Sequence, residues 1–453
     1  ATLRNAIDWS WNLLLPWEQA ALAQCSVFDG GFTLEAAEAV IDLSSWPGAP
    51  AILDAVQVLV DKSLLRTWVP VEQRRHDIEE PYFGMYLSIH DYAAEKLAAA
   101  GASGERTVEQ RHGAYFASFG SDERLRSLFR RGRGSGARRR DLVLELDNLV
   151  AACRRAVARG DAATAVGSFR AAWEALATQG PFDVAIALGA EVDAIAAIKP
   201  SLHAAALTSA ARANIAAGRL EHASVLLSRA LAFAQAANDP GREAEVLTRL
   251  ANAERQQGRM AEARRSAERA LALRSAVGEA DGVALAELGI VQRQTGAMDE
   301  ARETYERALA IDRKSGDADA EAKTLNSLAI VHAEQGRFDL ARKHFEAALA
   351  VGRELGDRRQ EGLVLGNLGT LNIEQGRLAL GREQCEAALA IHRDTGDRTE
   401  EGNTLANLAT LDLGEDRIDA ARAKLTAALA IAHETGSRRT EGVVLGMLGA
   451  LER

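Results

Sequence analysis

The sequence predicts a mainly α protein in which a small front domain with a β-hairpin precedes an α-solenoid of stacked helix pairs. Three observations lead to this prediction. The 453 residues include only 8 prolines, while alanine and leucine, which favour helices, are abundant. From about residue 201 the sequence repeats roughly every 40 residues, a period typical of stacked-repeat proteins. The first 100 residues lack this repeat and contain two β-rich segments.

The front domain is predicted to be a winged helix over residues 1–102. Helices are expected over residues 2–14, 16–28, 34–41 and 50–62. Thr33 is a plausible N-cap, and Ile7, Trp11 and Leu14 form an inward stripe. Two β-rich pieces follow, "LLRTWVP" and "PYFGMYLSI", with a polar hairpin tip at residues 71–80 between them. Helices followed by a hairpin have the order of a winged helix.

Residues 103–160 are predicted to form a helical linker with an arginine-rich loop. Its arginines are Arg124, Arg126, Arg130, Arg131, Arg133, Arg138, Arg139 and Arg140. Such a stretch can contact nucleic acid. We favour a solvated linker instead, because only Phe129 supplies an aromatic ring within it. The last of these front-domain helices, "AILDAVQVLVDKSLL", carries two Asp and one Lys, which suits packing within the protein better than contact with DNA.

The repeat is marked by glycines at a fixed spacing. They are Gly218, Gly258, Gly296, Gly336 and Gly376, and Asp416 takes the next place. Successive positions differ by 40, 38, 40, 40 and 40 residues. Around Gly336, apolar residues at helical spacing predict a first helix over 320–335 and a second over 339–355. Glycine ends the first helix because it adopts a left-handed conformation at little cost.

Small residues also recur at fixed positions, which lets paired helices approach closely. The first helices share Ala211, Ala251, Gly289, Ala329, Gly369, Ala409 and Gly449. The second helices share Ala223, Ala263, Ala301, Ala341, Gly381 and Ala421, and further on Ala230, Ala270, Ala308, Ala348, Ala388 and Ala428. At these residues the chain resembles the tetratricopeptide repeat, in a 40-residue form.

The resemblance covers residues 201–453, as about six units plus a truncated last one. A degenerate unit is expected over residues 161–200, with Gly180 as its turn glycine and Trp173 in place of a small residue. Because the last unit has only its first helix and the chain starts at Ala1, we expect the natural protein to extend beyond both ends.

The resemblance implies a binding face, since the first helices of tetratricopeptide arrays line a concave surface. The residues placed there by register are Glu245, Thr248, Asn252, Ile290, Arg293, Lys323, Asn326, Ile330, Thr370, Asn403 and Thr410. The partner would be a protein, a peptide or a small inducer. Gly366 and Ala406 replace the asparagine found at Asn326, which departs from a uniform clamp for an extended peptide. The alternative is that several of these positions are ordinary solvated ones.

The front domain and linker resemble a second family. The phrases "LRNAIDWSWNLL", "SVFDGGFTLEAAEAV", "LVDKSLL", "FGMYLSIHDYAAEKL" and "LELDNLVAACRRAVARGD" are similar to the winged helix and following helix of bacterial signal-transducing ATPases with numerous domains (STAND). The resemblance implies an ATPase domain upstream of this chain, which would bind ATP or ADP and pack against the winged helix. It also implies that Tyr86 or His90, depending on the alignment, senses the nucleotide. The alternative is that His90 is a surface residue.

The residues give no indication of chemistry within this chain. It has no "GK[ST]" P-loop, no Gly-x-Ser-x-Gly elbow and no His-Glu-x-x-His helix. Nine scattered His and three distant Cys lack metal-ligand spacing, and the acidic residues are expected on solvated helix faces. We therefore expect neither an enzyme, nor a metal, nor a cofactor held by this chain.

The net charge and the hydropathy of the sequence indicate where the protein is expected to be found and which partners it is expected to bind. The net charge of -10 argues against nucleic acid as the partner of the whole chain. No stretch approaches the roughly 18 apolar residues of a membrane span, and no signal peptide is visible. We expect a cytoplasmic protein that does not bind membranes. The leading hypothesis is the non-catalytic sensor part of a STAND regulator; the alternative is a DNA-binding transcriptional regulator that uses the winged helix and the arginine-rich loop.

Overall fold

The computed structural model describes residues 3–69, 81–130, 135–177, 180–435 and 437–451. Within these residues it is helical apart from one two-stranded antiparallel sheet, which confirms the predicted mainly α class. The chain divides into two compact units. Unit 1 holds Ala1–Leu125, Ala137–Ala175 and Ala187–Leu202, and unit 2 holds Arg126–Gly136, Leu176–Ile186 and His203–Arg453.

Unit 1 starts with four helices, two strands and a fifth helix, in the predicted order. Their bounds are α1 Leu3–Asn12, α2 Pro16–Cys25, α3 Leu34–Val40, α4 Ile52–Asp61, β1 Arg66–Trp68, β2 Tyr82–Gly84 and α5 Leu87–Ala99. Thr33 caps α3 as predicted, since its hydroxyl accepts from the Ala36 amide at 3.2 Å. The second strand is shorter than predicted, because Leu87 already begins α5. The predicted hairpin tip at 71–80 lies outside the described residues.

A buried polar cluster connects the sheet of unit 1 to two further helices, α6 (Ala102–Ser118) and α9 (Leu146–Arg159). The Glu145 carboxylate accepts from Tyr82 Oη at 2.8 Å and from Asn148 Nδ2 at 2.9 Å. The Asn148 amide oxygen accepts from the Asp29 backbone at 2.9 Å. Burial raises the pKa of Glu145 to about 7. The expectation that carboxylates lie only on solvated faces was therefore wrong, because neutral hydrogen-bond donors satisfy this one inside the protein.

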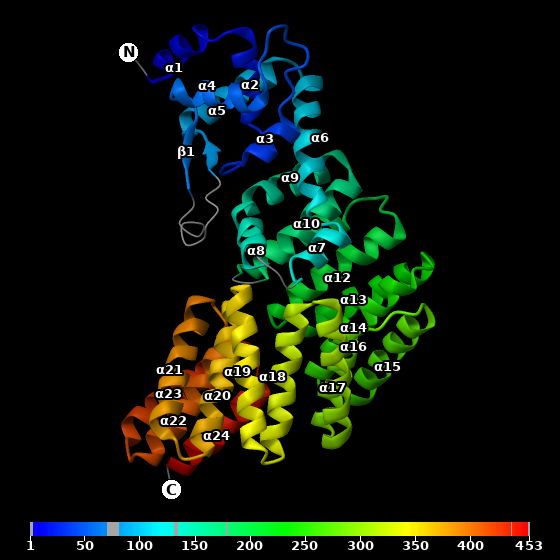
Figure 1. Ribbon diagram of the computed structural model, residues 1–453, viewed down its shortest axis with the longest axis vertical. Helices are drawn as coiled ribbons and strands as arrows, with labels where there is room; N and C mark the ends of the chain where they lie inside the picture. Colours follow the sequence, from blue (N-terminus) through cyan, green and yellow to red (C-terminus); the bar gives the residue numbers. More distant parts are fainter. Residues whose placement is uncertain (1–2, 70–80, 131–134, 178–179, 436, 452–453) are drawn as a thin grey trace. The chain divides into compact units, whose positions relative to one another are not determined.

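Unit 2 is an array of antiparallel helix pairs, and Figure 1 shows its later pairs stacked in sequence order from green to red. Five of the helices described contain residues of both units: α7 Asp122–Ser127, α8 Ser135–Leu144, α10 Ala162–Leu176, α11 Phe182–Asp193 and α12 Pro200–Ala216. The remaining helices are α13 Leu220–Ala236, α14 Pro240–Gln256, α15 Met260–Ala276, α16 Gly282–Gln294, α17 Met298–Ser315, α18 Ala318–Glu334, α19 Phe338–Leu355, α20 Arg358–Glu374, α21 Leu378–Asp394, α22 Arg398–Gly414, α23 Ile418–Thr435 and α24 Arg438–Leu451.

The small residues of the repeat lie where helices of a pair touch. A Cβ added at Gly289 would lie 2.8 Å from the Tyr305 ring, and one added at Gly369 would lie 2.5 Å from Cys385 Sγ. Tyr305 and Cys385, predicted to fill the space between helices, are fully buried. The helices on both sides of Gly336 match their predicted bounds within two residues. The predicted packing of first against second helices is thereby confirmed.

One repeat is two residues shorter than the others, and the loss falls on its first helix. Helix α16 has 13 residues, whereas the first helices before and after it have 17. Gly296 still ends this helix, and Asp281 still caps it. The shorter spacing therefore changes where α16 starts, while the contact between α16 and α17 keeps the register of the other repeats.

Candidate partner-binding face

Each first helix from α14 to α22 begins at an aspartate that caps it. The carboxylate accepts from the backbone amide three residues further on in every case, at Asp239, Asp281, Asp317, Asp357 and Asp397. The turn at the other end has a positive φ, at the glycines and also at Asp416. These two signals fix where each helix starts and ends, so equivalent side chains form rows along the array.

The predicted partner-binding residues lie in such rows on α14, α16, α18, α20 and α22. Lys323 and Thr410 are exposed, whereas Thr248 and Asn326 are only 5% and 7% exposed. The others are half-buried: Glu245, Asn252, Ile290, Arg293, Ile330, Thr370 and Asn403. We call these eleven residues, together with Leu363, Asn367 and Asn407 of the same helices, the first-helix face. Thr248 offers a partner little surface, since its hydroxyl donates to the Ala244 carbonyl at 3.0 Å.

Hydrogen bonds between neighbouring first helices bring many of these side chains together. Asn367 Nδ2 donates to Asn326 Oδ1 at 2.9 Å, and Asn407 Nδ2 donates to Thr370 Oγ1 at 3.0 Å. Two repeats earlier, Glu287 occupies the position of Asn367 and accepts from Asn252 at 3.3 Å. This linking position was not among the predicted site residues. The signal that could have found it is a polar residue nine places before each turn residue, at Glu287, Ser327, Asn367 and Asn407.

The first-helix face changes in charge along its length. From α14 to α18 its charged groups are paired: Arg242 with Glu245 at 2.5 Å, Arg255 with Glu287 at 2.6 Å, Arg293 with Glu334 at 2.7 Å and Lys323 with Asp319 at 2.6 Å. On α20 and α22 the residues of the first-helix face itself are uncharged amides, hydroxyls and apolar groups, while the neighbouring positions equivalent to Asp319 and Glu334 hold Arg359 and Glu374 on α20. These uncharged residues are Leu363, Asn367, Thr370, Asn403, Asn407 and Thr410. This second half can exchange hydrogen bonds with neutral polar groups and contact apolar side chains.

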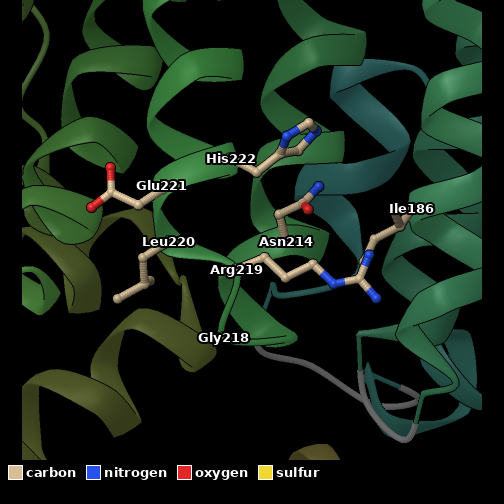
Figure 2. A pocket seen from close by; sticks show the side chains of 7 residues that line it. All are labelled: Ile186, Asn214, Gly218, Arg219, Leu220, Glu221 and His222. Carbon is tan, nitrogen blue, oxygen red and sulfur yellow. The ribbon is translucent and has the colours of Figure 1, made fainter. Parts of the chain in front are cut away.

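An open cavity of about 460 Å³ lies at the start of the array, at the turn between α12 and α13 (Figure 2). Figure 2 shows Arg219 extending from this turn toward Ile186 of α11. The Arg219 guanidinium is already paired with Asp183 at 2.7 Å. Buried Asn214 also lines the cavity, and its side-chain amide donates to the Ala210 carbonyl at 2.8 Å. The Arg219 guanidinium and the Asn214 amide nitrogen are therefore committed to other groups, whereas the buried Asn214 amide oxygen has no hydrogen-bond partner among the described residues.

The two residues predicted to sense nucleotide lie in different surroundings in unit 1. His90 lines a cavity of about 270 Å³ together with Arg66, Met85 and the Gly30–Gly31 backbone. Tyr86 is 59% exposed, and the Arg66 guanidinium stacks on its ring at 5.3 Å. The His90 imidazole lies 3.6 Å from the Asp91 carboxylate. Of the two, His90 lines this cavity and Tyr86 does not.

The part of the chain that the structure describes holds no cluster of three or more side chains suited to a metal ion. Its three cysteines, Cys25, Cys153 and Cys385, are buried, and burial raises the pKa of each thiol. Across the described ranges, no helix combines the length and apolar character needed to cross a membrane.

Curated relatives match only part of the chain. Proteins of Mycobacterium bovis and Mycobacterium tuberculosis that carry the name of HTH-type transcriptional regulators are 37% identical to it over 118 residues. The match spans 25% of this chain and only 12% of each relative.

Solved structures share the fold over more of the chain. A STAND protein with a tetratricopeptide repeat sensor from Pyrococcus horikoshii is similar over 99% of this chain and 64% of that one, with a TM-score of 0.56 and 16% identity. A Rap protein complexed with Competence and Sporulation Factor is similar over 72% of this chain and 98% of that one, with a TM-score of 0.53 and 12% identity.

The repeat itself is matched directly. The sequence model of the tetratricopeptide repeat family matches residues 242–314, 281–354, 320–380 and 360–434. These overlapping matches cover α14 to α23, which confirms the predicted resemblance. The array of unit 2 is a tetratricopeptide-repeat solenoid, and the chain as a whole resembles the STAND proteins that carry such a sensor.

Proposed function

We propose that this chain is a non-catalytic sensor of a STAND-type regulator. The first-helix face would bind a protein, a peptide or a small inducer, and the front domain, a winged helix, would couple binding to a nucleotide-binding domain elsewhere in the protein. The observation that carries the proposal is the uncharged half of the first-helix face on α20 and α22. Its amides and hydroxyls suit the backbone of an extended peptide, which is neutral and polar. The solved Rap protein, of the same fold, is complexed with a factor of its own.

The experiment selects peptides from a displayed library on the whole chain and measures their affinity by calorimetry. We expect Leu363→Asp on α20 to weaken binding at least tenfold, because it places a charge in the uncharged half. The matched control is Leu380→Asp on α21, a 40% exposed leucine of a second helix, which should leave the affinity unchanged. Equal losses in both variants, or failure to select any peptide, would contradict a peptide-binding face.

For the front domain we propose that His90 and Arg66 face the phosphates of a nucleotide held by the other domain. An imidazole and a guanidinium in one cavity suit phosphate oxygens. The test compares ADP retention by the full-length protein with that of His90→Ala and Tyr86→Ala variants. Faster ADP release in His90→Ala alone supports the assignment, and unchanged release in that variant removes it.

A DNA-binding function has one observation in its favour, the names of the mycobacterial relatives. The solvent side of α4 opposes it, because Leu53, Asp54 and Asp61 are exposed there and Asp61 accepts from Gln57 at 2.7 Å. A gel shift of the whole chain at low salt separates the two functions, since a helix that reads DNA should give salt-dependent binding.

A further inference from the structure

The end of α7 and the residues that follow it contact the array far along the sequence. Arg126–Arg130 belong to unit 2, whereas the first residues of α7 belong to unit 1. The Ala318 backbone amide donates to the Phe129 carbonyl at 2.9 Å, and Arg130 and Asp317 form an antiparallel bridge. Ala318 is the first residue of α18, so a strand-type bond joins this segment to the turn between α17 and α18.

The contact lies at a buried helix start. Ala318 is 1% exposed and the first residue of α16, Gly282, is also buried, whereas the first residues of α14, α20 and α22, which are Pro240, Arg358 and Arg398, are exposed. Leu128, one residue before the bonded carbonyl, is 8% exposed. The backbone bond therefore joins the segment to a helix start where solvent is excluded.

Charge also favours the contact. The turn and first residues of α18 carry Asp317, Asp319 and Glu321, while the segment carries Arg126 and Arg130. Opposite charges across an extended contact add affinity that salt weakens.

We propose that the edge at the start of α18 is a docking surface for a short arginine-bearing segment, occupied by this chain's own residues 126–130 (the end of α7, a turn and the bridging Arg130), which act as a releasable latch. The same helix carries Lys323 and Asn326 of the first-helix face, five and eight residues from Ala318. If that face binds a partner, as the proposed function has it, the partner and the latch share α18 and influence each other's affinity reciprocally.

The test removes the donor of the latch bond and leaves α18 in place. Ala318→Pro deletes the amide hydrogen at the first helical position, where proline is well tolerated. The chain supports this choice, since Pro240 follows Asp239 at the equivalent start of α14. We expect trypsin to cleave after Arg126 and Arg130 at least fivefold faster in this variant than in the unchanged chain. The matched control, Arg358→Pro at the start of α20, should leave the rate unchanged.

A second variant, Leu128→Asn, leaves α18 untouched and should also accelerate cleavage, with circular dichroism confirming that both variants remain folded. Rates equal to those of the unchanged chain in both variants would overturn the latch, as would equal acceleration in Arg358→Pro. Because cleavage is measured without a partner, this outcome is independent of whether the first-helix face binds peptide.

Discussion

At the scale of single residues, the glycines inside the helices differ from those in the turns because packing, not backbone conformation, requires them. A Cβ at Gly369 would lie 2.5 Å from Cys385 Sγ and 3.1 Å from the Gly381 carbonyl oxygen. At Gly366 of the same helix, an added Cβ would lie 3.8 Å from its nearest atoms, which is an ordinary van der Waals contact. Two glycines three residues apart on α20 therefore have different packing environments.

This difference predicts the effect of alanine at the two positions. Gly369→Ala should lower the free energy of unfolding by about 1–3 kcal/mol, because it overpacks the contact with α21. Gly366→Ala should leave it unchanged or slightly higher, since the added methyl group fits and alanine favours a helix. Urea unfolding followed by circular dichroism measures both. Equal losses would mean that helix geometry, rather than the contact with Cys385, requires glycine.

The sequence pattern did not predict that carboxylates would be buried. Neighbouring side chains determine whether each buried carboxylate is charged. Burial works to raise the pKa of Asp412, but hydrogen bonds from Lys424, Arg417 and Arg382 outweigh it and lower the pKa to about 2. Asp312 instead accepts from the Thr324 hydroxyl at 2.8 Å, and burial raises its pKa to about 7. A sequence pattern does not distinguish these cases, because the deciding partners lie on other helices.

The Asp312 pKa predicts a pH dependence of stability. Since the folded pKa is above the unfolded value of about 4, the contribution of Asp312 is fully present below pH 4 and is lost as pH rises through 7. Asp312→Asn keeps an acceptor for Thr324 without a charge. Between pH 5 and pH 7.5 the unchanged chain should lose about 1–2 kcal/mol more stability than this variant. Asp394→Asn, at an exposed position, serves as the control, and it should lose as much stability over this pH range as the unchanged chain. If this control lost only as much as Asp312→Asn, the assignment of the pH dependence to Asp312 would be contradicted.

At the scale of the helix pair, each repeat carries a polar residue four places before its turn. These residues are Asn214, Glu254, Gln292, His332, Asn372 and Asp412. Several pair with the second helix of the same repeat: Glu254 with Ser266 at 2.8 Å, Asn372 with Gln384 at 2.7 Å, Asp412 with Lys424 at 2.5 Å, and His332 with the stacked ring of His344 at 5.3 Å. Every pair uses different chemistry at one shared position. This arrangement can favour pairing within a repeat over pairing between the similar helices of different repeats.

A double-mutant cycle on the repeat formed by α20 and α21 tests the pairing. Asn372→Leu alone leaves Gln384 without its partner and should cost about 1–3 kcal/mol. Adding Gln384→Leu should recover most of the loss, because no polar group then remains unpaired. The measurement is the free energy of unfolding of the four proteins. Losses that simply add would show that the two side chains do not interact.

The helix pairs also show which features of the fold could be predicted from the sequence. The caps, the turn glycines and the small-residue positions are local or periodic signals, so helix bounds and pairing followed from them. The contacts of Asn367 and Asn407 depend on which residue of the next repeat lies opposite, and the 40-residue period alone does not state this. The shortened α16 shows the limit in another way, since its spacing was visible but the position of the missing residues was not.

At the scale of the whole array, contacts extend beyond neighbouring repeats. Repeats of a solenoid ordinarily contact only their neighbours. Here the Arg359 guanidinium of α20 lies over the Phe182 ring of α11, 5.9 Å from its centroid. A Cβ at Gly218, in the first full repeat, would lie 3.5 Å from the Thr435 carbonyl oxygen, at the end of α23. The ends of unit 2 therefore approach each other, which a period in the sequence could not reveal.

This closure predicts coupling between α20 and α11 despite their separation in sequence. Arg359→Ala removes its ion pair with Asp397 at 2.8 Å and a cation–π contact worth about 0.5–1 kcal/mol, and it should raise amide exchange in α11 by about two- to fivefold. Hydrogen exchange with mass spectrometry reads this helix directly. The matched control is Arg393→Ala, which removes an equivalent ion pair, Arg393 with Glu401 at 3.0 Å, and has no contact with α11 among the described residues. If α11 exchanged at the same rate in both variants, the array would behave as an open solenoid, in which a change in α20 affects only the neighbouring repeats.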